Sequence, residues 1–155
     1  MISRRVLLGI DRRQSGFTLI ELMIVVGIIA IILAIAVPNL LRSRIQSNES
    51  AAMSNMRTIV GAEFAYHGAN TAFTVDFNDL TGTAPPFLDG EWAVPRSGYA
   101  YVLGGDGNNF TINANAESYG VTGNKGFYTD SSGVIRFNSM ANADASSAPV
   151  GEAAP

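Results

Sequence analysis

One carboxylate, that of Glu21, lies inside a segment that is otherwise almost wholly apolar. The segment covers residues 17–40 and reads FTLIELMIVVGIIAIILAIAVPNL. A charge at the centre of a bilayer costs roughly 2.5–3.5 kcal/mol on insertion scales, and it costs less near a helix end. Two interpretations follow. Either the positive N-terminus of a helix holds Glu21 at the membrane interface, or Glu21 is buried with a partner cation, because an unpaired buried charge is unfavourable.

Few other side chains in the sequence could carry catalysis or bind a metal. His67 is the one histidine and cysteine is absent, which excludes a disulfide, a thiolate metal site and a cysteine nucleophile. The sequence has no HExxH motif, no phosphate loop and no Ser–His–Asp set at a suggestive spacing. The oxygen-rich segments 76–80 and 104–109 lack the full spacing of a calcium loop, so calcium there is the lesser alternative. We expect no enzymatic activity, no cofactor and no metal, and we expect His67 to cap carbonyls at a helix end.

The charges are divided unevenly along the chain, whose formal charge is −3. The first 16 residues contain Arg4, Arg5, Arg12 and Arg13 against only Asp11. Without these five charges, the 10 basic and 13 acidic residues become 6 and 12, so the rest of the chain carries −6. Phosphate contacts need clustered lysine and arginine. We therefore exclude nucleic acid as a partner.

A basic segment followed by a long apolar one is typical of an export signal or a membrane anchor. An ordinary signal peptide has an apolar core of roughly 7–15 residues and a small-x-small cleavage site. Crossing the hydrocarbon of a bilayer takes about 20 helical residues. Residues 17–40 are long enough for that, and no small-x-small site follows them at the right place. We therefore expect a retained membrane helix, with the arginines and the N-terminus on the cytoplasmic side.

Residues 10–40 resemble the N-terminal segment of type IV pilins and of the pseudopilins of type II secretion. The family pattern is a basic leader, a Gly-Phe junction, threonine and leucine, a glutamate as the fifth residue after the junction, and a proline near the end of an apolar helix. The matching residues are Gly16, Phe17, Thr18, Leu19, Glu21 and Pro38. The match covers about a fifth of the chain. The remainder lacks both the disulfide of many type IV pilins and the Asp-Pro-Trp-Gly pattern of major pseudopilins.

The resemblance implies a source for the partner cation of Glu21. In this family a membrane-embedded prepilin peptidase cuts between the glycine and the phenylalanine, here Gly16 and Phe17, and methylates the new terminus. The amino group of Phe17 stays cationic after one methylation. In a filament, Glu21 of one subunit would neutralise the terminal amine of a neighbour, so Phe17 and Glu21 would carry assembly. The implied partners are the prepilin peptidase, further copies of the chain, the inner-membrane assembly machinery and membrane lipid.

One helix is predicted from Phe17 to about Tyr66, apolar in its first half and amphipathic in its second. Gly27 weakens this helix, and Pro38 predicts a kink because proline lacks an N–H and clashes with the preceding turn. In related filaments the segment before this proline is often unwound, so residues 30–38 either extend on assembly or stay in a gently curved helix. The apolar stripe of the second half follows helical spacing and comprises Leu41, Ile45, Ala52, Met56, Ile59, Val60 and Phe64.

Beyond the helix, alternating segments predict a small antiparallel sheet of three or four strands. The segments are 98–104, 109–115, 125–130 and 133–138, with turn residues between them. Their apolar face is expected to cover the stripe on the helix, which makes the fold class α+β. The Ala/Ser/Pro-rich residues 141–155 predict a disordered tail. The apolar face includes Tyr99, Tyr101, Leu103, Phe110, Ile112, Phe127 and Val134.

These elements divide the chain into a leader (1–16), a transmembrane or filament-core helix (17–39), a pilin-like globular domain that includes the amphipathic half of the helix (40–140), and the tail (141–155). The resemblance implies a prepilin, a structural subunit of a type IV pilus or pilus-like filament. It would be anchored in the bacterial inner membrane before assembly and located in a pilus or periplasmic filament afterwards. Two alternatives stay open: a pseudopilin of a type II secretion system, and a single-span membrane-anchored binding protein with no filament role.

Overall fold

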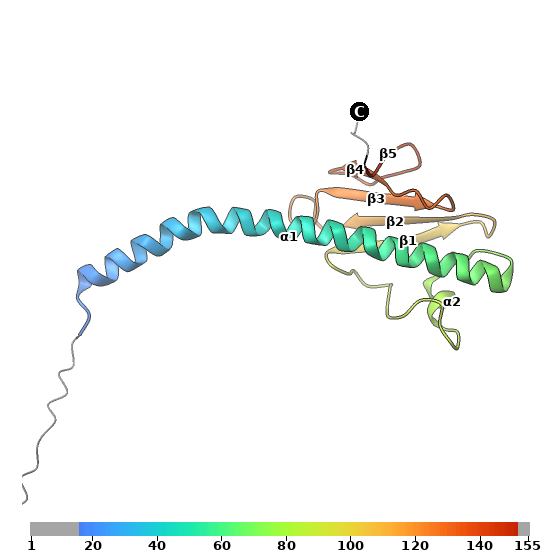
Figure 1. Ribbon diagram of the computed structural model, residues 1–155, viewed down its shortest axis with the longest axis horizontal. Coiled ribbons are helices and arrows are strands. Elements are labelled where there is room, and N and C mark those ends of the chain that lie inside the picture. Colours follow the sequence, from blue (N-terminus) through green and yellow to red (C-terminus); the bar gives the residue numbers. More distant parts are fainter. Residues whose placement is uncertain (1–15, 152–155) are drawn as a thin grey trace, which may run out of the picture. The chain divides into compact units, whose positions relative to one another are not determined.

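The computed structural model describes residues 16–151, so only Gly16 of the predicted leader lies within it. The chain divides into two compact units between Pro38 and Asn39, and each unit is described by itself. The elements are α1 (Leu19–Asn70), α2 (Phe77–Thr81), β1 (Tyr99–Gly105), β2 (Phe110–Ala116), β3 (Lys125–Asp130), β4 (Arg136–Ser139) and β5 (Ala148–Pro149), as labelled in Figure 1.

The described part of the first unit is the apolar half of α1 with the three residues before it, 16–18. Every residue from 16 to 38 is exposed to solvent, and the exposed fraction is 77% for Leu19 and 65% for Ile35. By length and composition this helix can cross a membrane. Because burial of apolar surface is worth about 25 cal/mol per Å², an environment that removes this surface from water would stabilise the helix.

The second unit contains one antiparallel sheet with strands in chain order, β1-β2-β3-β4-β5. Burial alternates along β2, where Phe110, Ile112 and Ala114 point into the core. The register places Leu103 opposite Ile112 and Ala114 opposite Phe127. Since side chains alternate between the two faces of a strand, the apolar residues of neighbouring strands gather on one face.

The second half of α1 lies along this apolar face (Figure 1). Phe64 contacts Phe110 edge to face, with ring centroids 5.9 Å apart, and Asn55 donates a hydrogen bond to the hydroxyl of Tyr101 at 2.9 Å. The predicted α+β architecture, a long helix packed on an antiparallel sheet, is confirmed. The core cluster combines Ala52, Met56, Ile59 and Ala62 of the helix with Tyr99, Phe110, Ile112 and Phe127 of the sheet.

The sheet is larger than predicted, with five strands in place of three or four. The fifth strand, β5, comes from the segment 141–155 that the composition predicts to be disordered. It pairs with β4 through Arg136 and Pro149, and the N–H of Val150 donates to the carbonyl of Ile135 at 2.8 Å. The prediction of disorder is therefore wrong for residues 141–151, because the open edge of β4 offers backbone partners that composition does not reveal.

Two element boundaries differ from the prediction, and the second of them changes which residue is buried. The helix begins at Leu19 instead of Phe17. Val134, predicted on the apolar face, is 41% exposed, and its neighbour Ile135 is buried instead. The reason is that β4 begins only at Arg136, so Val134 lies in the preceding loop, outside the strand alternation.

Two carboxylates, Glu49 and Glu63, lie on the buried face of α1. Lys125 pairs with Glu49 at 3.5 Å between Nζ and Oε2. Glu63 is fully buried. Its Oε2 accepts the N–H of Thr74 at 3.2 Å, whereas its Oε1 has no hydrogen-bond partner. The two glutamates therefore differ in how their charge is compensated, although both occupy the same helical stripe.

Burial raises the pKa of Glu63 from 4.5 to about 7. The N–H of Thr74 lowers this pKa and the nearby carboxylate of Asp79 raises it further. In the unfolded chain Glu63 releases its proton near pH 4.5, while in the folded chain it keeps the proton up to about pH 7. Because the folded state binds more protons in this window, Glu63 makes the domain less stable as pH rises through it.

We predict that Glu63→Gln removes most of the loss of stability between pH 4.5 and about pH 7. Each unit of pKa shift is worth about 1.4 kcal/mol, so the wild-type chain should lose a few kcal/mol across this window and the variant much less. Urea unfolding of the full chain in mild detergent, followed by the fluorescence of the single tryptophan, Trp92, measures the free energy of unfolding of both proteins at each pH. If this free energy depended equally on pH in the two proteins, Glu63 would not be the source of the pH dependence.

Candidate functional site

Thr18 and Glu21 form reciprocal hydrogen bonds at the N-terminus of α1. The N–H of Glu21 donates to Oγ1 of Thr18 at 3.2 Å, and the N–H of Thr18 donates to Oε2 of Glu21 at 3.3 Å. The hydroxyl of Thr18 also donates to the same Oε2 at 3.3 Å. This arrangement is a capping box, in which a threonine N-cap and a glutamate three residues later satisfy each other's backbone N–H groups.

The capping box gives Glu21 a local role that was not predicted, although the spacing Thr-x-x-Glu is a known signal for it. The carboxylate lies in the first turn, where the positive end of the helix dipole stabilises a negative charge. Both of its hydrogen bonds fall on Oε2, and within residues 16–151 Oε1 accepts none. One carboxylate oxygen is therefore engaged by the helix end, and the other is open to a second donor.

No cation in the part of the chain that the structure describes neutralises Glu21. The ion pair found there joins Lys125 to Glu49 in the second unit. The next basic residue after Glu21 in the sequence is Arg42, which also belongs to the second unit. The hydrogen bonds of the capping box are therefore the compensation that the described single chain offers to this carboxylate.

The Gly16–Phe17 junction directly precedes the capping box and lies outside the helix. The side chain of Phe17 is 86% exposed. A Cβ added at Gly16 would meet no described atom within 4 Å. Exposed, non-helical backbone is the preferred substrate of proteases, so the junction has the accessibility that cleavage requires.

Gly27 and Pro38 both lie inside α1, and residues 30–38 are helical in the single chain. A Cβ added at Gly27 would meet no described atom within 4 Å, so no neighbour within residues 16–151 requires glycine there. A kink at Pro38 and an extension of residues 30–38 on assembly both stay predictions.

In each of the two oxygen-rich segments, an aspartate carboxylate accepts hydrogen bonds from backbone N–H groups of the same segment. Asp76 is the N-cap of α2 and accepts the N–H of Asn78 at 2.9 Å. Asp106 accepts the N–H groups of Asn108 and Asn109 at 3.0 and 2.9 Å. Within residues 16–151, no three histidine, aspartate or glutamate side chains lie close enough together to hold a metal ion.

His67 lies in the last turn of α1, as predicted, but its ring packs on another ring. It stacks on Phe73 with centroids 4.3 Å apart. Among the described residues we find no hydrogen bond from this ring to a carbonyl, so the predicted capping by His67 is not observed.

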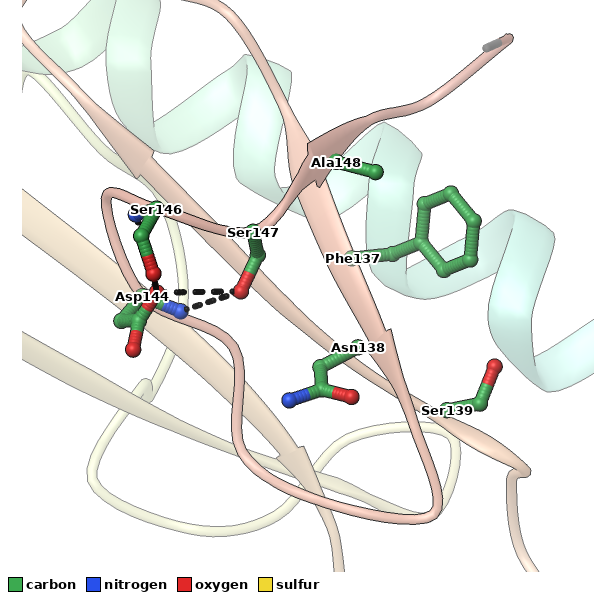
Figure 2. Close-up of a pocket in the computed structure, with 7 residues that line it drawn as sticks. All are labelled: Phe137, Asn138, Ser139, Asp144, Ser146, Ser147 and Ala148. Atoms are coloured by element: carbon green, nitrogen blue, oxygen red, sulfur yellow. Dashed lines mark hydrogen bonds between the residues drawn. The ribbon is translucent and has the colours of Figure 1, made fainter. Parts of the chain in front are cut away.

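A pocket of about 440 Å³ lies beside β4 and β5 (Figure 2). Its carboxylate, Asp144, accepts hydrogen bonds from the hydroxyls of Ser146 and Ser147 at 2.7 and 3.1 Å, and these bonds lower the pKa of Asp144. The lining residues include neither histidine, nor lysine, nor a second acid, so they provide no acid–base pair. The lining comprises Phe137, Asn138, Ser139, Asp144, Ser146, Ser147 and Ala148.

Comparison with known proteins finds similarity that includes the first turn of α1. Residues 11–37 match the prokaryotic N-terminal methylation motif. The chain is 41% identical over 73 residues to the type IV major pilin protein PilA of Myxococcus xanthus, covering 47% of this chain and 33% of that one. It is 40% identical over 63 residues to the type IV wide pilus major component PilA4 of Thermus thermophilus, covering 41% and 48%.

A similar match joins the chain to a secretion protein. It is 36% identical over 62 residues to the type II secretion system core protein G of Aeromonas hydrophila, covering 40% of this chain and 43% of that one. The chain thus spans less than half the length of each of these three relatives.

We predict that Thr18→Ala frays the first turn of α1. Loss of a threonine N-cap costs about 1 kcal/mol, which corresponds to roughly five-fold faster amide hydrogen exchange at Glu21. NMR of the full chain in detergent micelles measures this rate. Thr18→Ser is the matched control, because it keeps the hydroxyl and should keep the wild-type rate. If the alanine variant also exchanged at the wild-type rate, the capping box would not hold this helix end.

Proposed function

We propose that this chain, whose N-terminal segment is that of the type IV pilins and type II secretion pseudopilins, is a filament subunit made as a membrane-anchored precursor. The observation that carries the proposal is the start of α1. There a capped carboxylate lies at the start of the apolar, wholly exposed half of α1, shortly after an accessible Gly-Phe junction. The single-span binding protein would need none of these features together.

The first step of the proposal is cleavage between Gly16 and Phe17 by a prepilin peptidase. Hydrolysis leaves a carboxylate on Gly16 and an amino group on Phe17. An α-amino group has a pKa of about 8, so it is a cation at neutral pH, and one methylation preserves that charge. The methylation motif over residues 11–37 supports both modifications. In the uncut chain the same nitrogen is an uncharged amide, so processing creates a charge that was absent before.

The second step is pairing between this amine and Glu21 of a neighbouring copy. The capping box engages Oε2 of Glu21 and leaves Oε1 open, so a second donor can bind without disrupting the helix end. Charges attract more strongly away from water, but removing them from water is costly, and an unpaired buried charge costs several kcal/mol. The pair therefore selects the register in which subunits meet and adds little to total stability.

The third step is packing of the apolar helices against one another. The apolar side chains of residues 17–41 are exposed in the part of the single chain that the structure describes. In the precursor, lipid of the inner membrane would surround them, with the leader on the cytoplasmic side; in the filament, helices of other copies would replace the lipid. The acidic sheet domain would then lie on the outside of the filament. Assembly machinery in the inner membrane would move the subunit from one environment to the other.

A pseudopilin of type II secretion is the second candidate function. The similarity to core protein G at 36% identity favours it, while the similarity to PilA and PilA4 favours a pilus. Long surface filaments that contain this chain would support the pilus. Short periplasmic fibres together with a secretion defect in the deletion strain would support the pseudopilus.

Mass spectrometry of the chain purified from its bacterium tests the processing step. We predict the mass of residues 17–155 plus one methyl group on the amine of Phe17. Gly16→Ile should leave the leader attached, because the bulkier side chain occupies the position next to the bond that is cut. A wild-type chain that retains residues 1–16 in cells would contradict the proposed function.

Glu21→Val tests the pairing step. We predict wild-type cleavage and membrane insertion but a filament yield reduced roughly ten-fold or more, because the neighbour's amine would be left buried without a counter-ion. Glu91→Val is a matched control, since Glu91 is exposed in the second unit and carries the same change in charge and size. Immunoblots of sheared filaments give the yield. Normal yield from the Glu21 variant would exclude the role of this carboxylate.

A further inference from the structure

We propose that a basic pocket at one end of the globular domain receives carboxylates from the opposite end of a second copy, so that the domains stack head to tail. The inference rests on the filament function proposed above. The basic pocket is lined by Arg42, Ile45, Gln46, Glu49, Asn124 and Lys125. The acidic end comprises Asp76, Asp79, Asp106 and Asp130.

The basic pocket has a volume of about 350 Å³, enough for a carboxylate with its first water molecules. Arg42 is exposed and has no ion pair within residues 16–151. Lys125 pairs with Glu49 at 3.5 Å, so these two charges balance and Arg42 leaves the pocket with a net positive charge. Arg44, two residues further along α1, is also exposed and adds to the positive potential at this end.

The position of Lys125 is fixed by bonds that join the loop before it to α1 and Lys125 itself to β1. The N–H of Asn124 donates to Oε1 of Glu49 at 2.9 Å, and the side chain of Asn48 donates to the carbonyl of Thr122 at 2.8 Å. The hydroxyl of Tyr99 donates to the carbonyl of Lys125 at 2.8 Å. A pocket built on such contacts is organised before a ligand arrives, which reduces the entropy lost on binding.

The acidic end lies at the C-terminal end of α1. The N–H of Phe73, just beyond that helix, donates to the carbonyl of Gly107 in the β1–β2 turn at 2.9 Å, which brings Asp106 to this end. The hydroxyl of Ser131 donates to Asn109 of the same turn at 2.7 Å, which brings the turn after Asp130 alongside.

Asp76 and Asp79 belong to the same end, because they lie in and before α2, close to Glu63 of α1. Thr74 connects them: its N–H binds Glu63 at 3.2 Å and its hydroxyl binds Asp79 at 2.6 Å. None of the four aspartates is in an ion pair within the described residues. Four carboxylates without a counter-ion repel one another, and a cation from another molecule would relieve that repulsion.

The two charged ends lie far apart within the domain. β3 begins at Lys125 and ends at Asp130, about 16 Å later at 3.3 Å per residue. Arg42 and Glu63 are 21 residues apart on α1, about 32 Å at 1.5 Å per residue. The pocket of one chain therefore cannot reach its own acidic end and needs another copy.

The proposed filament supplies that copy in the right orientation. If Glu21 of each subunit pairs with the terminal amine of the next subunit in one repeated, heterologous contact, all helices run in the same direction. In such a parallel array the acidic end of one domain faces the basic end of the next one along the axis. Opposite charges on facing surfaces favour this contact over like-charged alternatives. Anionic lipid headgroups are the other ligands that could bind Arg42, because Arg42 follows the apolar segment closely in the sequence.

Cysteine cross-linking in filaments tests the contact, since the chain has no cysteine of its own. Gln46→Cys places a thiol in the basic pocket, and Asn108→Cys places one in the turn beside Asp106; both residues are exposed and uncharged. We expect oxidation of filaments of the double variant to give a ladder of disulfide-linked multimers on non-reducing gels. Ser54→Cys with Asn108→Cys is the matched control, with Ser54 exposed on α1 outside the pocket, and it should give no ladder.

Charge reversal gives a second measurement. Arg42→Glu should lower filament yield several-fold, and Arg57→Glu, an exposed arginine of α1 outside the pocket, should not. Wild-type filaments with a 46–108 pair that does not cross-link would overturn the inference while leaving the proposed function intact. Absence of filaments from the wild-type chain would overturn the function itself. If Arg42→Glu instead lowered binding of the subunit to phosphatidylglycerol vesicles without reducing filament yield, the pocket would be a lipid site and the inference would be wrong.

Discussion

A carboxylate at the start of an apolar helix needs compensation, and the first unit of the chain meets this need in two stages. In the single chain, Thr18 and the helix dipole stabilise the charge of Glu21 through one carboxylate oxygen. In the proposed filament, the amine that cleavage creates on a neighbour binds the other oxygen. Because the second stage would exist only after processing and only between copies, it would couple maturation to assembly. In this proposal the exposed apolar surface of residues 17–41 drives association, while the charge pair decides the register.

Three glutamates of α1 show three ways of compensating a carboxylate. The charge of Glu21 is compensated by the capping box and, in the proposed filament, by an amine of another copy. Glu49 is paired with Lys125 and fixes the loop that shapes the basic pocket. Glu63 is buried with one oxygen unpartnered, and its raised pKa favours the protonated form below about pH 7. Glu49 ties the helix to another element of the domain, Glu21 would tie it to another chain in the proposed filament, and Glu63 makes the far end of the domain sensitive to pH.

The sequence predicted the long helix, its apolar half and the first three strands, because periodicity and turn residues are local signals. The resemblance around Gly16 and Glu21 led to the expectation that Phe17 and Glu21 carry assembly, and this stays a prediction. The sequence did not predict β5, since pairing with β4 depends on an open edge that exists only in the folded sheet. The burial of Glu63 was missed because a polar residue in an apolar stripe is usually assigned to the other face; its spacing from Met56 and Ile59 was the signal. Each charged end combines residues that lie far apart in the sequence, so only the folded structure shows that they lie together.

The pairing of Glu21 of one copy with the terminal amine of another can be measured in the proposed filament by solid-state NMR. Filaments are assembled from a mixture of two labelled subunit pools: one pool carries ¹³C in the glutamate carboxyl groups and the other carries ¹⁵N in phenylalanine. We predict dipolar dephasing of the Glu21 carboxyl by the Phe17 amine, at the distance of about 4 Å or less that an ion pair requires. Absence of dephasing in well-ordered filaments would contradict it.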